Sequence, residues 1–182
     1  MKNASHVSTC LIVDDNDTFR KVLGRSFEKR GWKVLAAADA DAALRLAAAA
    51  HPSHAVIDLM LGPLAKNGLH VLKDLRGIEP EMRIVLLTGY ASVATAVEAL
   101  RLGATHYFAK PVDVDQIIDA FAGHCTASNE PPSEPMTLRQ LEWETLQRTL
   151  LGCNCNVSAA ARRMGMERRT LQRKLKKHAP KS

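Results

Sequence analysis

The sequence predicts an α/β domain with a parallel sheet, followed by a small all-α domain. Short β-rich apolar runs alternate with helical patterns as far as about residue 125, a proline-containing stretch follows, and the rest shows only helical periodicity. Charge divides the chain in the same way, since residues 1–134 carry 14 basic and 16 acidic side chains, whereas residues 135–182 carry 11 and 3. The second part is therefore expected to attract a polyanion.

The composition of the 182 residues is that of a globular protein, with 46% hydrophobic and 24% charged residues, which argues against wholesale disorder. No apolar run approaches the ~20 residues of a membrane-spanning helix. The stretch from Met1 to Cys10 is polar and lacks the apolar core of a secretory signal. We therefore expect a cytoplasmic protein whose cysteines are thiols, namely Cys10, Cys125, Cys153 and Cys155.

Five strand–helix repeats are predicted in the first part. Continuous apolar runs such as Leu11–Val13 and Ile84–Leu87 are typical of strands buried on both faces of a parallel sheet. Apolar residues at helical spacing, or a richness in alanine, mark the helix that follows each strand. The predicted strands are Cys10–Val13, Lys33–Ala37, Ala55–Asp58, Ile84–Thr88 and His106–Ala109, and the helices lie around Phe19–Lys29, Ala42–Ala50, Leu69–Leu75, Val93–Leu100 and Val114–Cys125.

The second part is predicted to consist of a linker and three helices. Residues 126–137 contain three prolines and two glutamates, which favours a semi-extended linker. Asn156 or Ser158 is the candidate cap of the second helix, and Gly165 the break after it. A domain of roughly 45 residues is near the lower size limit for an independent core, so we expect dimerisation or docking to assist it. The predicted helices are Leu138–Leu151, Val157–Met164 and Arg168–Lys177.

Charged and polar side chains stand where four of the predicted strands end. If the sheet order is 2-1-3-4-5, these ends are neighbours and their side chains converge on one crevice. Three carboxylates there need a hard divalent cation, and a carboxylate beside a cation and an ammonium group can accept a phosphoryl group. Any one of these aspartates could instead cap a helix. The prediction therefore rests on the occurrence of all these residues together at four strand ends. The residues are Asp14, Asp15, Asp58, Thr88 and Lys110.

These segments resemble the receiver domain of two-component response regulators. The resemblance spans about residues 8–125 and implies a flavodoxin-like (βα)5 fold with sheet order 2-1-3-4-5. One departure is the loop Gly62–Gly68, which is longer than the usual proline-aspartate-glycine turn. The matching pieces are LIVDDN (11–16), AVIDLML (55–61), VLLTGYAS (85–92) and YFAKP (107–111).

The resemblance also implies a role for each site residue. Asp58 would be the phosphoacceptor, Thr88 and Lys110 would contact the phosphoryl group, and Tyr107 would be the aromatic residue that swings inward. A cis peptide bond is implied between Lys110 and Pro111. The implied Mg²⁺ site consists of Asp15, Asp58, the main-chain carbonyl of Met60, and Asp14 through a metal-bound water.

The last predicted helix has one basic face and one apolar face. Leu171 and Leu175 lie on the apolar face, and Arg169, Gln172, Arg173 and Lys176 lie at i, i+3, i+4 and i+7 on the other. Such a helix suits the DNA major groove, and the small residues and Gly165 before it complete a helix-turn-helix pattern. A basic amphipathic helix can also be a solvated surface or bind an acidic membrane or protein, but the tight turn favours DNA.

Residues 156–180 resemble the Fis-type helix-turn-helix found at the ends of many bacterial regulators. Joined to a receiver without an intervening ATPase domain, they resemble the RegA/PrrA/ActR group of redox-responsive regulators. Glu167, at the start of the last helix, departs from the Fis-type pattern, and its acidic side chain could either contact cytosine or cap the helix. Fis-type domains dimerise through their first helix, for which the candidates are Leu138, Leu141, Trp143, Leu146 and Leu150, with intramolecular packing as the alternative. The implied DNA contacts are Arg168, Arg169, Thr170, Arg173 and Lys174.

Cysteine and histidine spacings predict no metal site. Cys153 and Cys155 lack two further zinc ligands, and a disulfide between them would be strained. A redox role for this pair stays open only because the resemblance points to redox signalling. The seven histidines show no ligand spacing and are expected at the surface.

The sequence therefore predicts a response regulator rather than an enzyme. A sensor histidine kinase would phosphorylate Asp58, and the phosphorylated homodimer would bind double-stranded DNA and regulate transcription, without a membrane partner. One alternative is a metal-dependent phosphatase that acts through an aspartyl phosphate, but Met60 stands where its general acid would be. The other is an interaction protein whose basic tail binds a polyanion other than DNA.

Overall fold

A five-stranded parallel sheet forms the centre of the first part of the chain. The computed structural model describes residues 8–61, 67–89, 93–124, 142, 145–146, 148–150, 152–153 and 156–178, with the side chains of the last range described as far as residue 175. The sheet order is β2-β1-β3-β4-β5, which confirms the predicted 2-1-3-4-5 arrangement. The strands are β1 (Thr9–Val13), β2 (Lys33–Ala37), β3 (His54–Asp58), β4 (Arg83–Thr88) and β5 (His106–Ala109).

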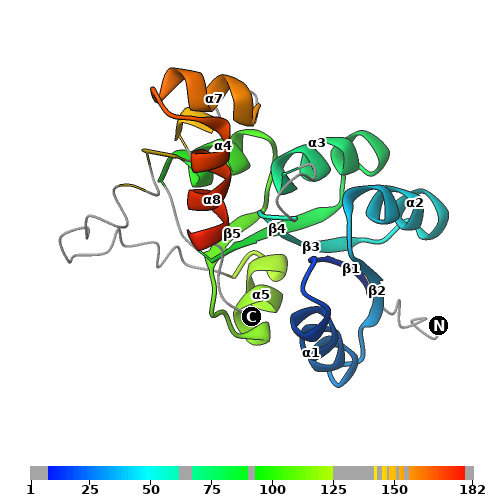
Figure 1. The fold of residues 1–182 in the computed structure, drawn as a ribbon. Coiled ribbons are helices and arrows are strands. Elements are labelled where there is room, and N and C mark those ends of the chain that lie inside the picture. The colour runs from blue at the N-terminus through cyan, green and yellow to red at the C-terminus, as the bar shows by residue number, and fades with distance from the viewer. Residues whose placement is uncertain are drawn as a thin grey trace, which may run out of the picture.

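Helices cover both faces of the sheet (Figure 1). The faces are filled by two separate apolar clusters, one under α1 and α5 and the other under α2, α3 and α4. Side chains at the N-caps of four of these helices, such as Asn16 and Asp113, accept backbone N–H bonds and explain where the helices start. The helices are α1 (Asp17–Glu28), α2 (Ala40–Ala50), α3 (Gly68–Ile78), α4 (Val93–Arg101) and α5 (Val114–Ala122).

The register of the strands brings their carboxyl ends to one edge. Val13 of β1 pairs with Ile57 of β3, and Thr88 of β4 pairs with Ala109 of β5. Asp58 lies opposite Leu87 one step further along β3. Side chains that follow the ends of β1, β3, β4 and β5 can therefore meet, as the sequence predicts.

Two histidines pack against aromatic rings instead of lying free at the surface. The ring of His54 is 4.7 Å from Trp32 and 4.6 Å from Phe121, centroid to centroid, and burial lowers the pKa of His54 to about 4. His106 is stacked on Phe108 at 4.2 Å. Both histidines are partly buried, so the expectation of surface positions holds only in part for them.

The described helices of the second part are α7 (Val157–Arg163) and α8 (Arg168–His178), which agree with the predicted boundaries to within a residue. Asn156 is the N-cap of α7, since its side chain accepts the N–H of Ala159 at 3.0 Å, and Gly165 has a positive φ of 63° between the two helices. The predicted linker, 126–137, lies outside the described residues.

An apolar cluster holds the second part together, and we call it the C-terminal cluster. Leu146 and Leu150, both candidates for a dimer seam, are buried in it, so the intramolecular alternative holds for these two residues. Leu138, Leu141 and Trp143 lie outside the described residues. The C-terminal cluster consists of Leu146, Leu150, Ala160, Ala161, Leu171 and Leu175.

Two further expectations concern the cysteines, predicted to be thiols, and the absence of a membrane-spanning helix. Cys10 and Cys153 are free thiols, and burial raises the pKa of Cys10 far above its usual range. Cys125 and Cys155 lie outside the described residues. No helix within the described ranges is long and apolar enough to cross a membrane.

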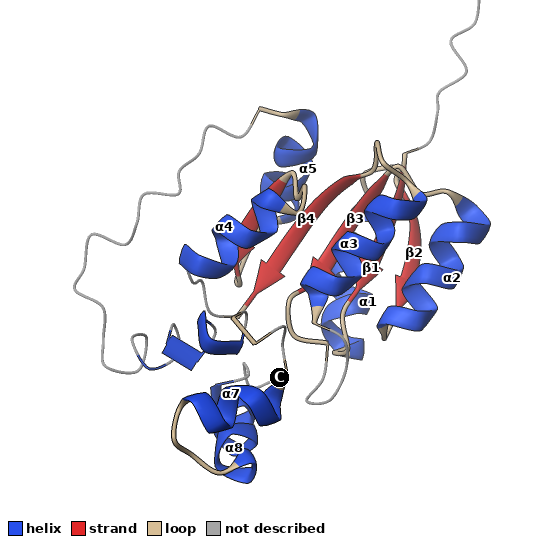
Figure 2. Cartoon of the chain, turned by 90° about the horizontal axis from the view of Figure 1, so that it is seen from above, coloured by secondary structure: helices blue, strands red, loops and turns tan. Residues whose placement is uncertain are grey.

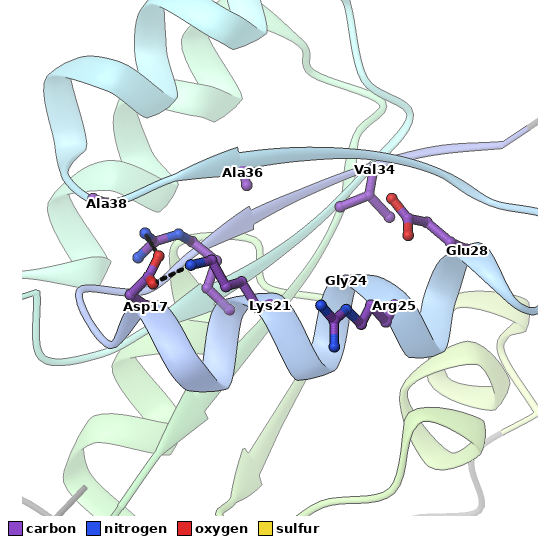
Figure 3. A pocket seen from close by; sticks show the side chains of 9 residues that line it. Asp17, Lys21, Gly24, Arg25, Glu28, Val34, Ala36 and Ala38 are labelled. Carbon is purple, nitrogen blue, oxygen red and sulfur yellow. Dashed lines mark hydrogen bonds and ion pairs between the residues drawn. The ribbon is translucent and has the colours of Figure 1, made fainter.

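A groove of about 490 Å³ runs between α1 and the edge strand β2 (Figure 3). Small residues, including Gly24 and Ala36, leave this space open. On its rim Asp17 forms ion pairs with both Arg20 and Lys21, so much of the local charge is already neutralised. None of the predicted site residues lines the groove. The groove is therefore distinct from the predicted site at the strand ends.

Thr95 of α4 is fully buried, and within the described part of the chain its hydroxyl oxygen has no hydrogen-bond partner. Leaving a buried hydroxyl unpaired costs about 1–3 kcal/mol. Thr95→Val keeps the shape and removes the hydroxyl, so we expect the free energy of unfolding to rise by about 1 kcal/mol in urea titrations.

Thr105→Val is the matched control, because the hydroxyl oxygen of Thr105 accepts the N–H of Ile84 at 3.0 Å. It removes an acceptor that is in use, so it should lower the free energy of unfolding. Changes of the same sign in both variants would contradict this account of Thr95.

Candidate functional site

Asp58 is the last residue of β3 and is only 7% exposed. Each of its two carboxylate oxygens has a donor. The ammonium nitrogen of Lys110 lies 2.8 Å from Oδ1, and the backbone N–H of Met60 donates to Oδ2 at 3.0 Å. Asp58 is therefore a buried carboxylate held in a fixed orientation by one charge and one amide.

Lys110 joins Asp58 to a second buried carboxylate. Its ammonium nitrogen is 2.7 Å from Oδ2 of Asp14, which is 2% exposed. The same nitrogen lies 4.1 Å from the centre of the Phe19 ring, a cation–π contact that adds to its anchoring. Of the five predicted strand-end residues, the structure thus brings Asp14, Asp58 and Lys110 into direct contact.

The backbone around Lys110 fixes where its side chain starts. The Lys110 N–H donates to the carbonyl of Thr88 at 2.6 Å, which continues the pairing of β4 and β5. The bond between Lys110 and Pro111 is cis, as expected from the resemblance. The side chain consequently leaves the edge of the sheet toward β1 and β3.

The pKa values of the site show how its charges compete. Burial raises the pKa of Asp58 to about 6, against the attraction of Lys110 and the Met60 amide, and the charge of Asp14 raises it further. Burial acts to lower the pKa of Lys110, but the two carboxylates outweigh it and raise that pKa. Since the pKa of Asp58 is about 6 and that of Lys110 is raised, the pair of Asp58 and Lys110 is largely ionised at neutral pH.

Asp15 occupies a different position from its neighbour Asp14. Its side chain is mostly exposed. Loss of hydration at the covered part of its carboxyl group raises the pKa of Asp15, and the charge of Asp14 raises it further. Within the described residues, no group of three or more His, Cys, Asp or Glu side chains is arranged to hold a metal ion. The predicted Mg²⁺ site of Asp14, Asp15 and Asp58 therefore stays a prediction.

The start of α3 packs directly on the backbone that carries Asp58. The N–H of Gly68 donates to the carbonyl of Leu59 at 2.9 Å. A Cβ atom at Gly68 would lie 2.9 Å from the Cα of Leu59 and would collide with the carbonyl oxygen of Asp58, so the close approach requires glycine. Gly68 was not among the predicted site residues, because only the packing of α3 on β3 shows what it touches. Residues 62–66 of the unusual loop lie outside the described residues.

Thr88 and Tyr107 are both buried, with 1% and 4% exposure. Thr88 ends β4 beside the site, as predicted. Tyr107 lies in the apolar cluster beneath α2, α3 and α4, so its ring faces inward. The predicted swing of Tyr107 remains a prediction.

The two faces predicted for α8 are present in part. Leu171 and Leu175 are buried in the C-terminal cluster, while the guanidinium-bearing residues Arg168, Arg169 and Arg173 are exposed. This leaves one face of α8 free to bring positive charge to a polyanion. The side chain of Lys176 lies outside the described residues.

Three predicted DNA contacts are half-buried, namely Thr170, Gln172 and Lys174. Lys174 forms an ion pair with Glu142, a contact 32 residues away in sequence that sequence reasoning missed. Arg162 and Arg163, at the end of α7, are exposed and add to the basic surface. The predicted DNA contacts did not include these two arginines, although two adjacent positive charges are visible in the sequence.

Comparison with known families gives two matches. Residues 10–122 match the model of the response regulator receiver domain. Residues 137–178 match that of the bacterial regulatory protein, Fis family.

Individual relatives match over nearly the whole chain. The acid tolerance regulatory protein ActR of Sinorhizobium medicae is 45% identical over 94% of this chain and 87% of its own length. The photosynthetic apparatus regulatory protein RegA of Rhodobacter capsulatus is 44% identical over 94% of this chain and 92% of its own. A response regulator from Burkholderia pseudomallei, crystallised with a phosphorylated aspartic acid, calcium and citrate, is 42% identical, covers 92% of this chain and 98% of its own, and has a TM-score of 0.60.

The raised pKa of Asp58 predicts a pH-dependent gain in stability for Asp58→Asn. Asp58 has a pKa of about 6 in the folded chain against an ordinary value of 3.8, so folding opposes its ionisation and stability falls as pH rises between these values. At pH of about 7, without added divalent cation, the variant should raise the free energy of unfolding by about 1–3 kcal/mol.

The gain should disappear below pH of about 4, where Asp58 is protonated in both states. Urea titrations across this range measure it, with Asp41→Asn on the exposed side of α2 as the control. A gain that persists undiminished at the lowest pH would show that the charge of Asp58 is not its source.

Proposed function

The chain belongs to the response regulators in which a receiver domain is joined to a Fis-type helix-turn-helix DNA-binding domain, and from this premise we propose that Asp58 is its phosphoacceptor. One observation carries the proposal. Asp58 is a buried carboxylate at the carboxyl edge of the sheet, with Lys110 on one oxygen and the Met60 amide on the other.

The chemistry follows from this arrangement. An oxygen of Asp58 forms the new bond to phosphorus, and the bond between phosphorus and the donor atom of a sensor histidine kinase breaks. Since the pKa of Asp58 is about 6, the carboxylate is largely ionised at neutral pH and can act as the nucleophile. Lys110 offsets the negative charge that develops on the phosphoryl oxygens. Position 60 supplies an amide and an apolar side chain, so it offers no general acid for a phosphatase.

Mg²⁺ is the proposed cofactor of the site. The available donors are the carboxylates of Asp14, Asp15 and Asp58 and the main-chain carbonyl of Met60, all of them oxygen ligands of the kind that a hard cation prefers. The charge of Asp14 acts to raise the pKa of both Asp15 and Asp58, and a cation would relieve this repulsion. When bound, Mg²⁺ supplies further positive charge beside the phosphoryl oxygens. The relative from Burkholderia pseudomallei, with calcium and a phosphorylated aspartic acid, supports this choice.

Thr88 and Tyr107 are the proposed switch residues. A phosphoryl group adds about −1.5 to −2 charge and three acceptor oxygens at Asp58. Thr88, buried at the end of the adjacent strand, can turn its hydroxyl toward one of these oxygens. Tyr107 on β5 then responds to the space that Thr88 leaves, and the face formed by α4, β5 and α5 changes shape.

The helix-turn-helix is proposed to read DNA as a homodimer formed on phosphorylation. We place the receiver at residues 8–125, the linker at 126–137 and the DNA-binding domain at 138–182. In the cytoplasm, the exposed guanidinium groups of α8 would meet phosphates and guanine edges in the major groove. Lys174, which is paired with Glu142, would have to exchange that partner for DNA. The proposed contacts are Arg168, Arg169, Thr170, Gln172, Arg173, Lys174 and Lys176.

Intact mass spectrometry tests the phosphoacceptor. Wild-type chain incubated with acetyl phosphate and Mg²⁺ should gain the mass of one phosphoryl group, and the gain should require the cation. Asp58→Asn should gain none, because it removes the nucleophilic oxygen, whereas the control Asp41→Asn should behave as the wild type. Phosphorylation of Asp58→Asn as readily as of the wild type would exclude Asp58.

Salt-dependent DNA binding tests the basic face of α8. Arg169→Ala and Arg173→Ala should each weaken binding to pooled genomic fragments, because each removes a positive charge that would neutralise a phosphate. Each should also reduce the slope of log affinity against log salt by about 1. Arg25→Ala, an exposed arginine on α1, is the control and should change neither quantity. Binding indifferent to Arg169 and Arg173 would point to a different polyanion or a different surface.

A further inference from the structure

The ring of Phe19 lies against the ammonium group at the centre of the site. The ammonium nitrogen of Lys110 is 4.1 Å from the ring centroid, in addition to its contacts with Asp14 at 2.7 Å and Asp58 at 2.8 Å. We propose that Phe19 is a positioning residue for phosphoryl transfer, which holds the charge of Lys110 in place while its N–H donors turn from Asp58 to the phosphoryl group. This inference rests on the proposed role of Asp58 as the phosphoacceptor.

The ammonium group of Lys110 is nearly enclosed by these neighbours. The Lys110 side chain is only 16% exposed, so water hydrates its charge poorly, and an unpaired buried charge is costly. An ammonium group has three N–H donors. The carboxylates of Asp14 and Asp58 lie within hydrogen-bond distance of it, and the negative face of an aromatic ring attracts the same charge. Phe19 therefore takes the place of water on one side of Lys110.

Hydrogen bonds at the start of α1 fix the position of Phe19. The backbone N–H of Asn16 donates to Oδ1 of Asp14 at 2.8 Å, and the N–H of Phe19 donates to the Asn16 side chain at 3.0 Å. The guanidinium group of Arg20 donates to the carbonyl of Asp14 at 2.6 Å. α1 starts at the edge of the sheet toward which the strand arrows point (Figure 2). The ring is thus attached to the same loop as one of the carboxylates that Lys110 binds.

A ring face suits a charge whose hydrogen bonds must change during a reaction. With acetyl phosphate, an oxygen of Asp58 forms a bond to phosphorus, the bond from phosphorus to the acetyl oxygen breaks, and acetate leaves. Lys110 then has to turn an N–H from Oδ1 of Asp58 toward a phosphoryl oxygen. The attraction between a cation and a ring depends on the distance of the charge from the ring face and not on the direction of one N–H. The ammonium group can therefore turn without losing this contact.

Apolar packing is the alternative role for the ring. Phe19 is half-buried and packs against the apolar cluster under α1 and α5, so truncating it also removes packing. The two roles need different properties of the side chain. Packing needs apolar volume, whereas positioning of Lys110 needs an aromatic face. Phe108 is a half-buried phenylalanine at the edge of the same cluster whose ring stacks on His106, so it separates the two roles.

Rates of phosphorylation test the proposal in the full chain. With acetyl phosphate and Mg²⁺, intact mass spectrometry measures the initial gain of phosphoryl mass. Phe19→Leu keeps an apolar side chain but removes the ring, so it should slow this gain by about threefold to thirtyfold, the effect of losing one cation–π contact. Phe19→Tyr keeps the ring and should restore the wild-type rate. Phe108→Leu makes the same truncation away from the cation and should be phosphorylated as the wild type.

Nuclear magnetic resonance gives a signature of the contact itself. Protons above the face of an aromatic ring resonate upfield because of the ring current. The ε-CH₂ protons of Lys110 should therefore be shifted upfield in the wild type, and this shift should be absent in Phe19→Leu and present in Phe108→Leu. In the wild type phosphorylated on Asp58 the upfield shift should persist, because the ring contact is kept while the hydrogen bonds change.

Three results would overturn the role of Phe19. They are a wild-type rate in Phe19→Leu, equal slowing in Phe19→Leu and Phe108→Leu, and loss of the upfield shift of Lys110 when the wild type is phosphorylated. The last measurement needs no variant, so it decides the proposal even if Phe19→Leu does not fold. Failure of the proposed function looks different, because the wild type would then gain no phosphoryl mass, while the shift of Lys110 would still report the contact.

Discussion

The shared ion pair of Lys110 with Asp14 and Asp58 is the constraint on which the site depends. Two buried carboxylates at one edge of a sheet repel each other, and in a medium of low polarity they stay ionised only near positive charge. Lys110 supplies that charge from the end of β5, where backbone pairing with Thr88 sets its starting point. Under the proposed role of Asp58, the same charge would offset the negative charge that a phosphoryl group brings to the site.

The sheet makes this constraint possible by bringing four strand ends to one edge. Parallel pairing in the order β2-β1-β3-β4-β5 places the ends of β1, β3, β4 and β5 beside one another. The packing of α3 then holds the backbone of Asp58 and Leu59 through Gly68, where a larger residue would collide with it. A rigid strand end supporting a charged side chain is the arrangement expected of a site that must hold its geometry during a reaction.

The chain combines a nearly neutral receiver with a strongly basic DNA-binding part. Net charge near zero keeps the receiver from binding nucleic acid, while the excess of basic residues after 135 concentrates attraction to DNA in α7 and α8. The two parts meet near Asp58, where the backbone N–H of Met60 donates to Asp58 and the side chain of Met60 packs against the C-terminal cluster.

The sequence by itself determined the strands, most helix boundaries and the pattern of site residues, and it reduced the cap of α7 to Asn156 or Ser158, of which the structure shows Asn156. Those features arise from local periodicity, from side chains that cap their own helix, and from residue types at strand ends. It also determined the family, because the matching motifs occur in order along the chain. The apolar runs alone predicted β2 and β5 to the residue.

Only the tertiary structure decided which side chains touch. Lys110 and Asp14 are 96 residues apart, and nothing local distinguishes Asp14, which is buried against Lys110, from Asp15, which stays exposed. The same holds for the aromatic packing of His54 and the pairing of Lys174 with Glu142. Contacts of this kind depend on how whole elements pack, and the distance between two atoms far apart in the chain is a property of the folded molecule that no local pattern encodes.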